Sequence, residues 1–191
     1  MLKLPKVNIL VAFPYFSKAI IKLLDNTDPN IFRLIIDSGA FTAWNTNKPI
    51  IFNDYCKFLK NIPKNWEYKA VQLDVFGNPE GTFINYNKML DLGFKDIMPV
   101  FTRGDTTQRL EQYYENTDYI MVGGIVIGGK NKNYIKWFHN VNKKRKSHWL
   151  GFNNTEFIKY YKPELVDSST WNNGQRFGRL DLYKGNGEFV N

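Results

Sequence analysis

Three aspartates stand at the ends of short apolar runs, where a carboxylate needs either partners or a chemical task. Asp37 closes the second such run of the chain, Asp74 the third and Asp167 the seventh. A single Asp in this position is more often a helix N-cap, but three of them predict a lined pocket. Convergent carboxylates without histidine ligands suit acid/base and nucleophilic work on a glycosidic bond. Magnesium held by the three carboxylates is the alternative chemistry.

Glycines mark two further apolar runs and extend the same pattern. Gly123 and Gly124 close the fifth run, and Gly151 lies in the sixth. Because glycine has no Cβ, it lets a flat ligand approach the backbone closely. The sequence therefore predicts a pocket lined by carboxylates and open backbone.

The elements that must position these residues alternate between strand-like and helix-like segments. Apolar runs cover residues 7–13, 33–37, 70–75, 96–101, 119–122, 149–152, 165–167 and 179–183, and helical patterns cover 16–24, 53–59, 81–92, 106–114, 134–144 and 156–160. Such alternation indicates βαβ units and a parallel sheet. Seven or eight units predict an α/β fold of the compact (β/α)8 TIM-barrel type, in which these strand ends meet at one face.

A doubly wound open sheet is the competing architecture. That fold usually has a glycine-rich phosphate-binding turn after its first strand. This chain has Phe13-Pro14-Tyr15 there instead. The barrel is therefore favoured, as a single domain over residues 1–191 that has no internal linker or repeat.

Composition limits the class of protein further. The 191 residues contain one cysteine and two histidines, which excludes an internal disulfide and a zinc site of the usual Cys/His type. We expect no metal, no cofactor and a buried structural thiol at Cys56. No run approaches the roughly 20 apolar residues that cross a bilayer, and no signal peptide is recognisable. These features predict a cytoplasmic protein without a membrane partner.

The positive charge predicts a polyanionic partner. A net charge of +8 and a pI near 9.4 favour nucleic acid. The densest basic run spans residues 130–146, with Tyr134, Trp137 and Phe138 among its lysines. It is either a nucleic-acid contact or a solvated helix whose aromatic side chains face the core. The candidates for contacts with nucleic acid, each with a surface or structural role as the alternative, are Arg103, Lys143, Lys144, Arg145 and Arg176.

Several motifs occur together in a family-like order. They are Asp37-Ser-Gly-Ala-Phe41, Gln72-Leu-Asp74, Val122-Gly-Gly124, Leu150-Gly151 and Val166-Asp167. In order and spacing they resemble the motifs of the tRNA-guanine transglycosylase superfamily. The likeness is greatest to its compact phage-type branch, the DNA 7-deazaguanine transglycosylases of the DpdA type. The resemblance covers roughly residues 33–178, and Asp-Ser-Gly-Ala-Phe is its most specific part.

The resemblance implies a role for each aspartate. Asp167 is similar to the nucleophile that attacks the sugar C1′ and forms a covalent glycosyl-enzyme. Asp37 matches the general acid/base that handles the proton of the leaving and incoming base, and Asp74 matches the carboxylate that reads the base edge. The residues implied to bind the base are Ser38, Phe41, Gly123, Gly124 and Gly151, with Trp44 as the other candidate for stacking.

Three departures from the family bear on the substrate. The chain has no Cys/His zinc subdomain, no clear counterpart in residues 99–104 to the family's base-contacting glutamine, and no appended RNA-binding domain. These differences favour DNA over tRNA. The sequence therefore predicts an enzyme that exchanges guanine in DNA for a free 7-deazaguanine base, in the host cytoplasm if it is phage-encoded. The alternatives are a tRNA-guanine transglycosylase and a non-catalytic barrel that binds nucleic acid or a nucleobase.

Overall fold

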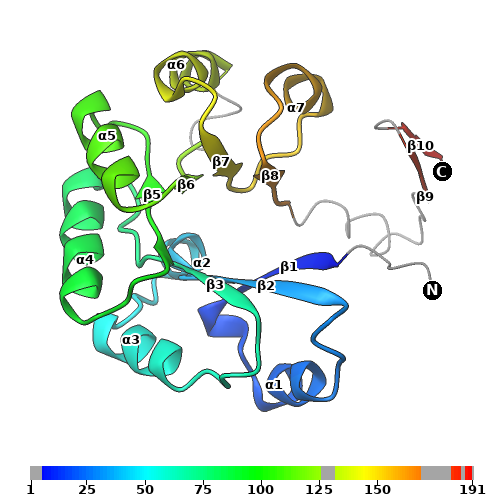
Figure 1. Cartoon of the computed structure of the whole chain (residues 1–191). Coiled ribbons are helices and arrows are strands. Elements are labelled where there is room, and N and C mark those ends of the chain that lie inside the picture. Colours follow the sequence, from blue (N-terminus) through cyan, green and yellow to red (C-terminus); the bar gives the residue numbers. More distant parts are fainter. Residues whose placement is uncertain (1–5, 126–131, 169–181, 186–187, 191) are drawn as a thin grey trace. The chain divides into compact units, whose positions relative to one another are not determined.

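The computed structural model describes residues 6–125, 132–168, 182–185 and 188–190. The chain divides into two compact units, Met1–Thr106 and Thr107–Asn191, and strands alternate with helices in each (Figure 1). No helix in this described part is long and apolar enough to cross a membrane.

The first unit is built on a four-stranded parallel sheet. Its strands are β1 (Val7–Ala12), β2 (Phe32–Asp37), β3 (Tyr68–Val71) and β4 (Ile97–Met98), in that order across the sheet. The connecting segments hold the 3-10 helix η1 (Phe13–Tyr15) and the helices α1 (Lys18–Asp25), α2 (Ala40–Thr46), α3 (Phe52–Lys60) and α4 (Pro79–Asp91). In Figure 1, α1 and α3 lie on the same side of β1 and β2.

Proline interrupts the last predicted strand of this unit. The apolar run 96–101 forms two short pieces, β4 and β5 (Val100–Phe101), which are separated by Pro99. Proline has no N–H to donate to a strand ladder, so one continuous strand is disfavoured there.

The core of the first unit forms around β2, whose consecutive residues Leu34, Ile35 and Ile36 are all buried. Neighbouring residues of a strand point to opposite faces, so both faces of this strand are covered, as expected for a parallel sheet. Tyr55 of α3 is also fully buried, and its hydroxyl donates a 2.6 Å hydrogen bond to the Val71 carbonyl where β3 ends. Helix α3 is thereby fastened to the carboxyl-terminal edge of the sheet.

The second unit contains three further parallel strands, with β7 (Lys146–Trp149) lying between β6 (Tyr119–Val122) and β8 (Leu165–Val166). Its helices are α5 (Thr107–Asn116), α6 (Lys132–Asn142) and α7 (Thr155–Tyr161). Two more strands, β9 (Leu182–Gly185) and β10 (Glu188–Val190), pair with each other in antiparallel direction. Leu110 of α5 and Phe138 of α6 are buried, as is Ile120 of β6, so the amphipathic helices contribute their apolar sides to the core.

The predicted α/β fold with parallel strands is confirmed. The described strands form two four-stranded sheets and one two-stranded sheet. Closure of the strands into one eight-stranded barrel stays a prediction. The eighth strand expected at 179–183 differs from the structure: residues 179–181 lie outside the described residues, and Leu182 begins β9, which pairs with β10 in antiparallel direction within the described part of the chain. It is therefore not a further parallel strand of the βαβ series.

Candidate functional site

The chain turns sharply where β2 ends, and glycine makes this turn possible. Gly39 has φ +82°, a conformation that residues with a Cβ rarely adopt, and a Cβ there would lie 2.5 Å from Cδ of Pro14. The Gly39 amide donates to Oδ2 of Asp37 at 2.9 Å, and the Ala40 amide donates to Oγ of Ser38 at 3.2 Å. The turn therefore starts α2 directly after two predicted site residues.

Ser38 and Asp74 connect the ends of the neighbouring strands β2 and β3. Oγ of Ser38 donates to Oδ1 of Asp74 at 2.8 Å, and Ser38 is completely buried. Burial raises the pKa of the Asp74 carboxyl above its usual value, while the hydrogen bonds from Ser38 and from its own backbone amide oppose that rise. Asp74 is thus a carboxylate with poor solvation of its charge, and a ligand that donates hydrogen bonds to it would stabilise it.

Side chains of α4 hold the segment that carries Asp74. Oγ1 of Thr82 accepts a hydrogen bond from the Val75 amide at 2.9 Å. Nδ2 of Asn85 donates to the Leu73 carbonyl at 2.9 Å. The two bonds flank Asp74 on both sides along the chain, so the position of its carboxylate depends on α4 as well as on the sheet.

The Tyr55 hydroxyl lies between the ends of the two strands that precede the predicted site carboxylates. Burial raises the pKa of this hydroxyl well above the usual value, and the negative charges of Asp37 and Asp74 raise it further. The hydroxyl oxygen lies 2.6 Å from the Val71 carbonyl oxygen and 3.4 Å from the carbonyl oxygen of Ile36, the residue before Asp37. The first unit therefore brings Asp37, Ser38 and Asp74 together at one edge of its sheet, as the motifs predict.

A cavity of about 390 Å³ adjoins Asp74, within the size range of small-molecule sites. Its lining combines three polar side chains with aromatic and aliphatic ones; the residues that matter here are Trp44, Ile50, Leu73, Asp74, Phe76 and Asn85. A mostly apolar wall with a few placed polar groups is the usual composition of a site for an organic ligand.

Two of the aromatic rings that line this cavity are stacked on each other, and the ring of Phe41 lies beside them. Trp44 and Phe76 have ring centroids 4.3 Å apart and an interplanar angle of 28°. The Phe41 ring lies 5.8 Å from Phe76, in a tilted arrangement. Trp44 is 58% exposed and Phe41 is 50% exposed, although both are large aromatic residues. Exposed rings beside a carboxylate suit a flat ligand that has an N–H edge.

Asp167 has a different set of partners in the second unit. Its Oδ1 lies 2.8 Å from Nε2 of His148 and accepts a 3.2 Å hydrogen bond from the Gly151 amide. His148 is almost fully buried, and the pairing of Trp149 with Val166 sets the register that brings it to Asp167. Both contacts end on the same oxygen, so they fix the orientation of the carboxyl group. An oriented carboxylate of this kind can act as a nucleophile.

The predicted glycines lie at the same edge of the second unit's sheet as Asp167. Gly123 and Gly124 directly follow β6, Gly151 follows β7 after one residue, and Asp167 follows β8. Gly124 and Gly151 have φ values of +73° and +66°. Parallel strands end at one common edge, so these four residues share it. Among the described residues, no three His, Cys, Asp or Glu side chains are grouped to hold a metal ion.

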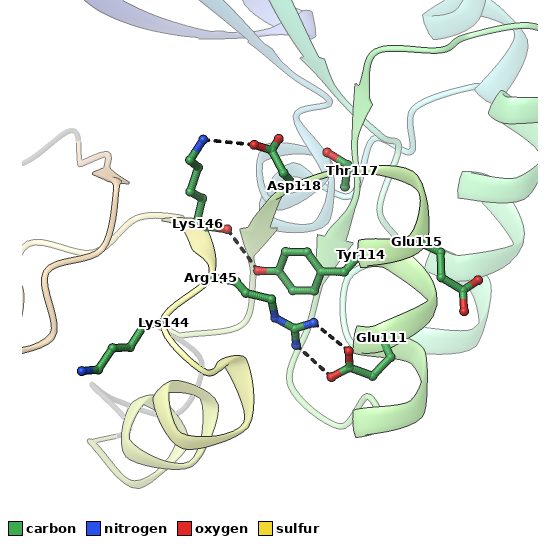
Figure 2. Close-up of a pocket in the computed structure, with 8 residues that line it drawn as sticks. All are labelled: Glu111, Tyr114, Glu115, Thr117, Asp118, Lys144, Arg145 and Lys146. Carbon is green, nitrogen blue, oxygen red and sulfur yellow. Dashed lines mark hydrogen bonds and ion pairs between the residues drawn. The ribbon is translucent and has the colours of Figure 1, made fainter.

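The end of the basic run is engaged in ion pairs inside the second unit (Figure 2). Both terminal nitrogens of Arg145 contact the Glu111 carboxylate, at 2.7 and 2.9 Å, and the guanidinium lies 3.8 Å from the centre of the Tyr114 ring. Lys146 pairs with Asp118 at 3.0 Å. A contact between Arg145 and nucleic acid stays a prediction, and phosphate would have to compete there with Glu111.

The rest of the basic run divides between the core and the surface. Tyr134 and Phe138 are buried, so two of its aromatic side chains face the core, whereas Trp137 is 39% exposed. Lys143 and Lys144 are exposed. Of the other basic candidates, Arg103 is exposed in the turn after β5, and Arg176 lies outside the described residues.

Three residues of these arrangements were not predicted from the sequence patterns. His148 belongs to no motif, and it is a buried polar residue in a strand that also begins with a lysine. Phe76 and Asn85 reach the cavity from the loop after β3 and from α4. Proximity to Asp74 in sequence is the one signal that points to Phe76.

Comparison with known proteins gives no relative for this chain. A scan against protein-family models finds no match, and searches of curated proteins and of solved structures find no significant match.

Proposed function

We propose that the chain is a transglycosylase that exchanges guanine in DNA for a 7-deazaguanine base, and that the cavity beside Asp74 binds the base. One observation carries this proposal. The Asp74 carboxylate, held by Ser38, lines a cavity that also contains the stacked rings of Trp44 and Phe76.

Guanine complements this cavity at its edge and at its face. The Watson–Crick edge of guanine presents two adjacent N–H donors, and a carboxylate offers two acceptor oxygens without a donor. The aromatic rings beside Asp74 offer a stacking surface, as in enzymes that hold an extruded base. A 7-deazaguanine differs from guanine at position 7, on another edge, and so keeps both donors. Adenine instead places a ring acceptor against the carboxylate, which disfavours it.

In the proposed reaction, a carboxylate oxygen of Asp167 attacks C1′ of a deoxyguanosine. The new O–C1′ bond replaces the C1′–N9 bond, whose electron pair leaves with guanine, and Asp37 supplies the proton that guanine takes up. The 7-deazaguanine then gives its N9 proton to Asp37, attacks C1′ and displaces Asp167. His148 and Gly151 orient the Asp167 carboxyl group for the first step. The proposal includes closure of the strands into one TIM barrel, as the resemblance implies.

The test of exchange uses the whole chain, a polymer and a free base. Duplex DNA, single-stranded DNA and tRNA are each incubated with a panel of 7-deazaguanines, and the digested nucleosides are analysed by mass spectrometry. Incorporation into DNA that disappears with Asp167→Asn supports the proposal. Incorporation into tRNA alone contradicts the choice of DNA, and tight base binding without incorporation identifies a non-catalytic binder.

Calorimetric titration with free bases tests the cavity separately. Guanine and 7-deazaguanine are expected to bind and adenine is not, because only the first two present paired donors to Asp74. Asp74→Asn should weaken binding, whereas Asp91→Asn, at an exposed carboxylate at the end of α4, is the matched control. Equal affinity for adenine and guanine contradicts the role assigned to Asp74.

A further inference from the structure

The outward side of α6 is basic and contains one exposed aromatic ring. Its exposed residues are Lys132, Asn133, Lys136, Trp137 and Asn140. The opposite side, with Tyr134, Ile135 and Phe138, is buried. No acidic residue occurs between positions 132 and 146. The outward side therefore carries positive charge that no carboxylate of its own segment neutralises.

Trp137 is held in place on this side. Its indole stacks on the ring of Tyr134, with centroids 5.9 Å apart and an interplanar angle of 22°. Tyr134 is buried, while Trp137 remains 39% exposed. A tryptophan that is supported from below and open to solvent can stack on a planar ligand with little loss of side-chain freedom.

The turn after α6 adds two lysines in a constrained conformation. Lys143 and Lys144 have φ values of +53° and +62°, a region that residues other than glycine seldom occupy. Asn142 and Arg145 bracket them with two hydrogen bonds, from Nδ2 of Asn142 to the Arg145 carbonyl at 2.7 Å and from Nε of Arg145 to the Asn142 carbonyl at 3.0 Å. Such conformations persist only where the surroundings enforce them, and they are common at functional sites.

The ion pairs below this turn leave its lysines outside them. Glu111 and Asp118 face Arg145 and Lys146, and in Figure 2 the Lys144 side chain points away from both carboxylates. Arg145 therefore has a structural role: its bidentate ion pair with Glu111 holds the turn against α5. The basic run can therefore contain an arginine that is paired with a carboxylate of this protein and still present the exposed Lys144 to a partner.

We propose that Lys132, Lys136, Trp137, Lys143 and Lys144, named here the lysine face, form a contact surface for single-stranded nucleic acid. The lysines bind backbone phosphates, and the indole of Trp137 stacks on an unpaired base. Stacking requires a base that is not paired within a duplex, which is why the single strand is favoured. This inference goes beyond the proposed function and does not depend on it, because a non-catalytic binder would use the same surface.

An anionic membrane is the other polyanion that such a helix could meet. A helix that binds a membrane surface inserts its apolar side between lipids. The apolar side of α6 is buried in the protein, so the charge pattern fits a nucleic acid better than a membrane. Binding to vesicles is accordingly an outcome that counts against the proposal.

The test measures binding of the whole chain to a fluorescein-labelled 20-nucleotide oligo-dT, and to a duplex of equal length, by anisotropy in a salt series. Lys136→Glu with Lys144→Glu is expected to weaken oligo-dT binding about 30-fold or more and to reduce the salt slope by about 1.4, since each lost phosphate contact accounts for roughly 0.7. Lys57→Glu with Lys88→Glu, at exposed sites on α3 and α4, has the same change of charge and should reduce binding less than about threefold.

Substitution of the ring tests the stacking role. Trp137→Ala is expected to weaken oligo-dT binding about 10-fold at every salt concentration, and Trp137→Phe should restore most of that loss. Thermal unfolding of each variant checks that it is folded.

Three results overturn the lysine face: equal losses in the two double variants, no change with Trp137→Ala, or competition by vesicles of anionic lipid. The assay contains no 7-deazaguanine and measures no turnover. Failure of base exchange therefore leaves its outcome unaffected, and the two proposals can fail separately.

Discussion

Asp74 and Asp167 both lie just beyond the end of a parallel strand, but the two regions surround them differently. Asp74 accepts a hydrogen bond from the neutral hydroxyl of Ser38, adjoins a largely apolar cavity, and has a pKa raised by burial. Asp167 contacts an imidazole and a backbone amide, both at Oδ1. The end of a strand positions each carboxylate, and the groups around that carboxylate determine its chemical role. Asp74 suits recognition of N–H donors, and Asp167 suits a reaction at an oriented oxygen.

The largest effect is expected for Asp167→Asn, which removes a nucleophilic oxygen but keeps the size of the side chain. Exchange should fall about 10⁴-fold or more, as expected when a nucleophile is lost. Affinity for the free base should change less than about twofold, because the base is assigned to Asp74. Incorporation rates and calorimetric affinities give the two numbers. Glu115→Gln, at an exposed carboxylate on α5, is the matched control. Retained exchange in Asp167→Asn would remove the proposed distinction between the two aspartates.

Asp74→Asn should show the reverse pattern, with a loss of affinity for the free base and little change in the exchange step at saturating base. The amide has one acceptor oxygen and brings a donor toward the base, so it loses one or two charge-assisted hydrogen bonds. At about 1.5–3 kcal/mol for a hydrogen bond to a charged group, the affinity for 7-deazaguanine should fall roughly 100-fold. Calorimetry checks the affinity, and a single-turnover assay at saturating base checks the exchange step. A variant that binds base normally but exchanges slowly would give Asp74 the role proposed for Asp167.

The turn at Gly39 offers a test of how rigidly the first region is built. Gly39→Ala combines an unfavourable φ with a Cβ 2.5 Å from Pro14, and we expect about 2 kcal/mol less stability from strain and overpacking. Gly77→Ala is the matched control, because Gly77 has φ +72° but no heavy atom within 4 Å of the added Cβ. Gly77→Ala should lower the free energy of unfolding by about 1 kcal/mol, from the backbone conformation alone. Urea unfolding measures both, and equal losses would show that the contact with Pro14 is not restrictive.

A smaller effect is expected at His148, the partner of Asp167. His148→Leu removes the ring nitrogen that contacts Oδ1, so kcat should fall about 10-fold while KM for the base stays unchanged. His148→Gln has a side-chain amide that can donate to the same oxygen, and it should recover part of the loss. Steady-state kinetics gives the split between kcat and KM. A change in thermal stability with kcat unaltered would reduce His148 to a structural residue.

His148 also shows where prediction from the sequence stopped. The order of strands and helices followed from apolar runs, because parallel strands buried on both faces are apolar along their length. The strand over β7 was expected three residues later than it lies, since Lys146, Ser147 and His148 read as polar. Ser147 and His148 are buried because each has a partner: Trp149 donates to Ser147, and Asp167 contacts His148. Pairings of this kind are tertiary and leave no periodic pattern.

The site residues of the first unit were more predictable from the sequence than those of the second unit. Asp37, Ser38 and Asp74 were all expected at one site, and the structure brings them together because β2 and β3 are adjacent. Helix α2 was not expected, since it is short, contains Thr and Asn, and begins after a glycine in the left-handed region without a side-chain cap. That helix carries Phe41 and Trp44. The aromatic residues were therefore predicted, although the element that presents them was not.

The smallest effect concerns pH and the charge of Asp74. Its folded-state pKa is raised by burial, so the folded protein binds this proton more tightly than the unfolded chain does. The protonated form is therefore the one that folding favours, and its contribution is fully present below the unfolded pKa. It is lost as the pH rises through the raised folded value.

Asp74→Asn cannot ionise, so the variant should gain stability relative to the wild type as the pH rises from acid toward neutral. Each tenfold difference in proton affinity corresponds to about 1.4 kcal/mol. Urea unfolding of both proteins across this pH range measures the difference. A wild type that instead gains on the variant with rising pH would mean that hydrogen bonds outweigh burial at Asp74.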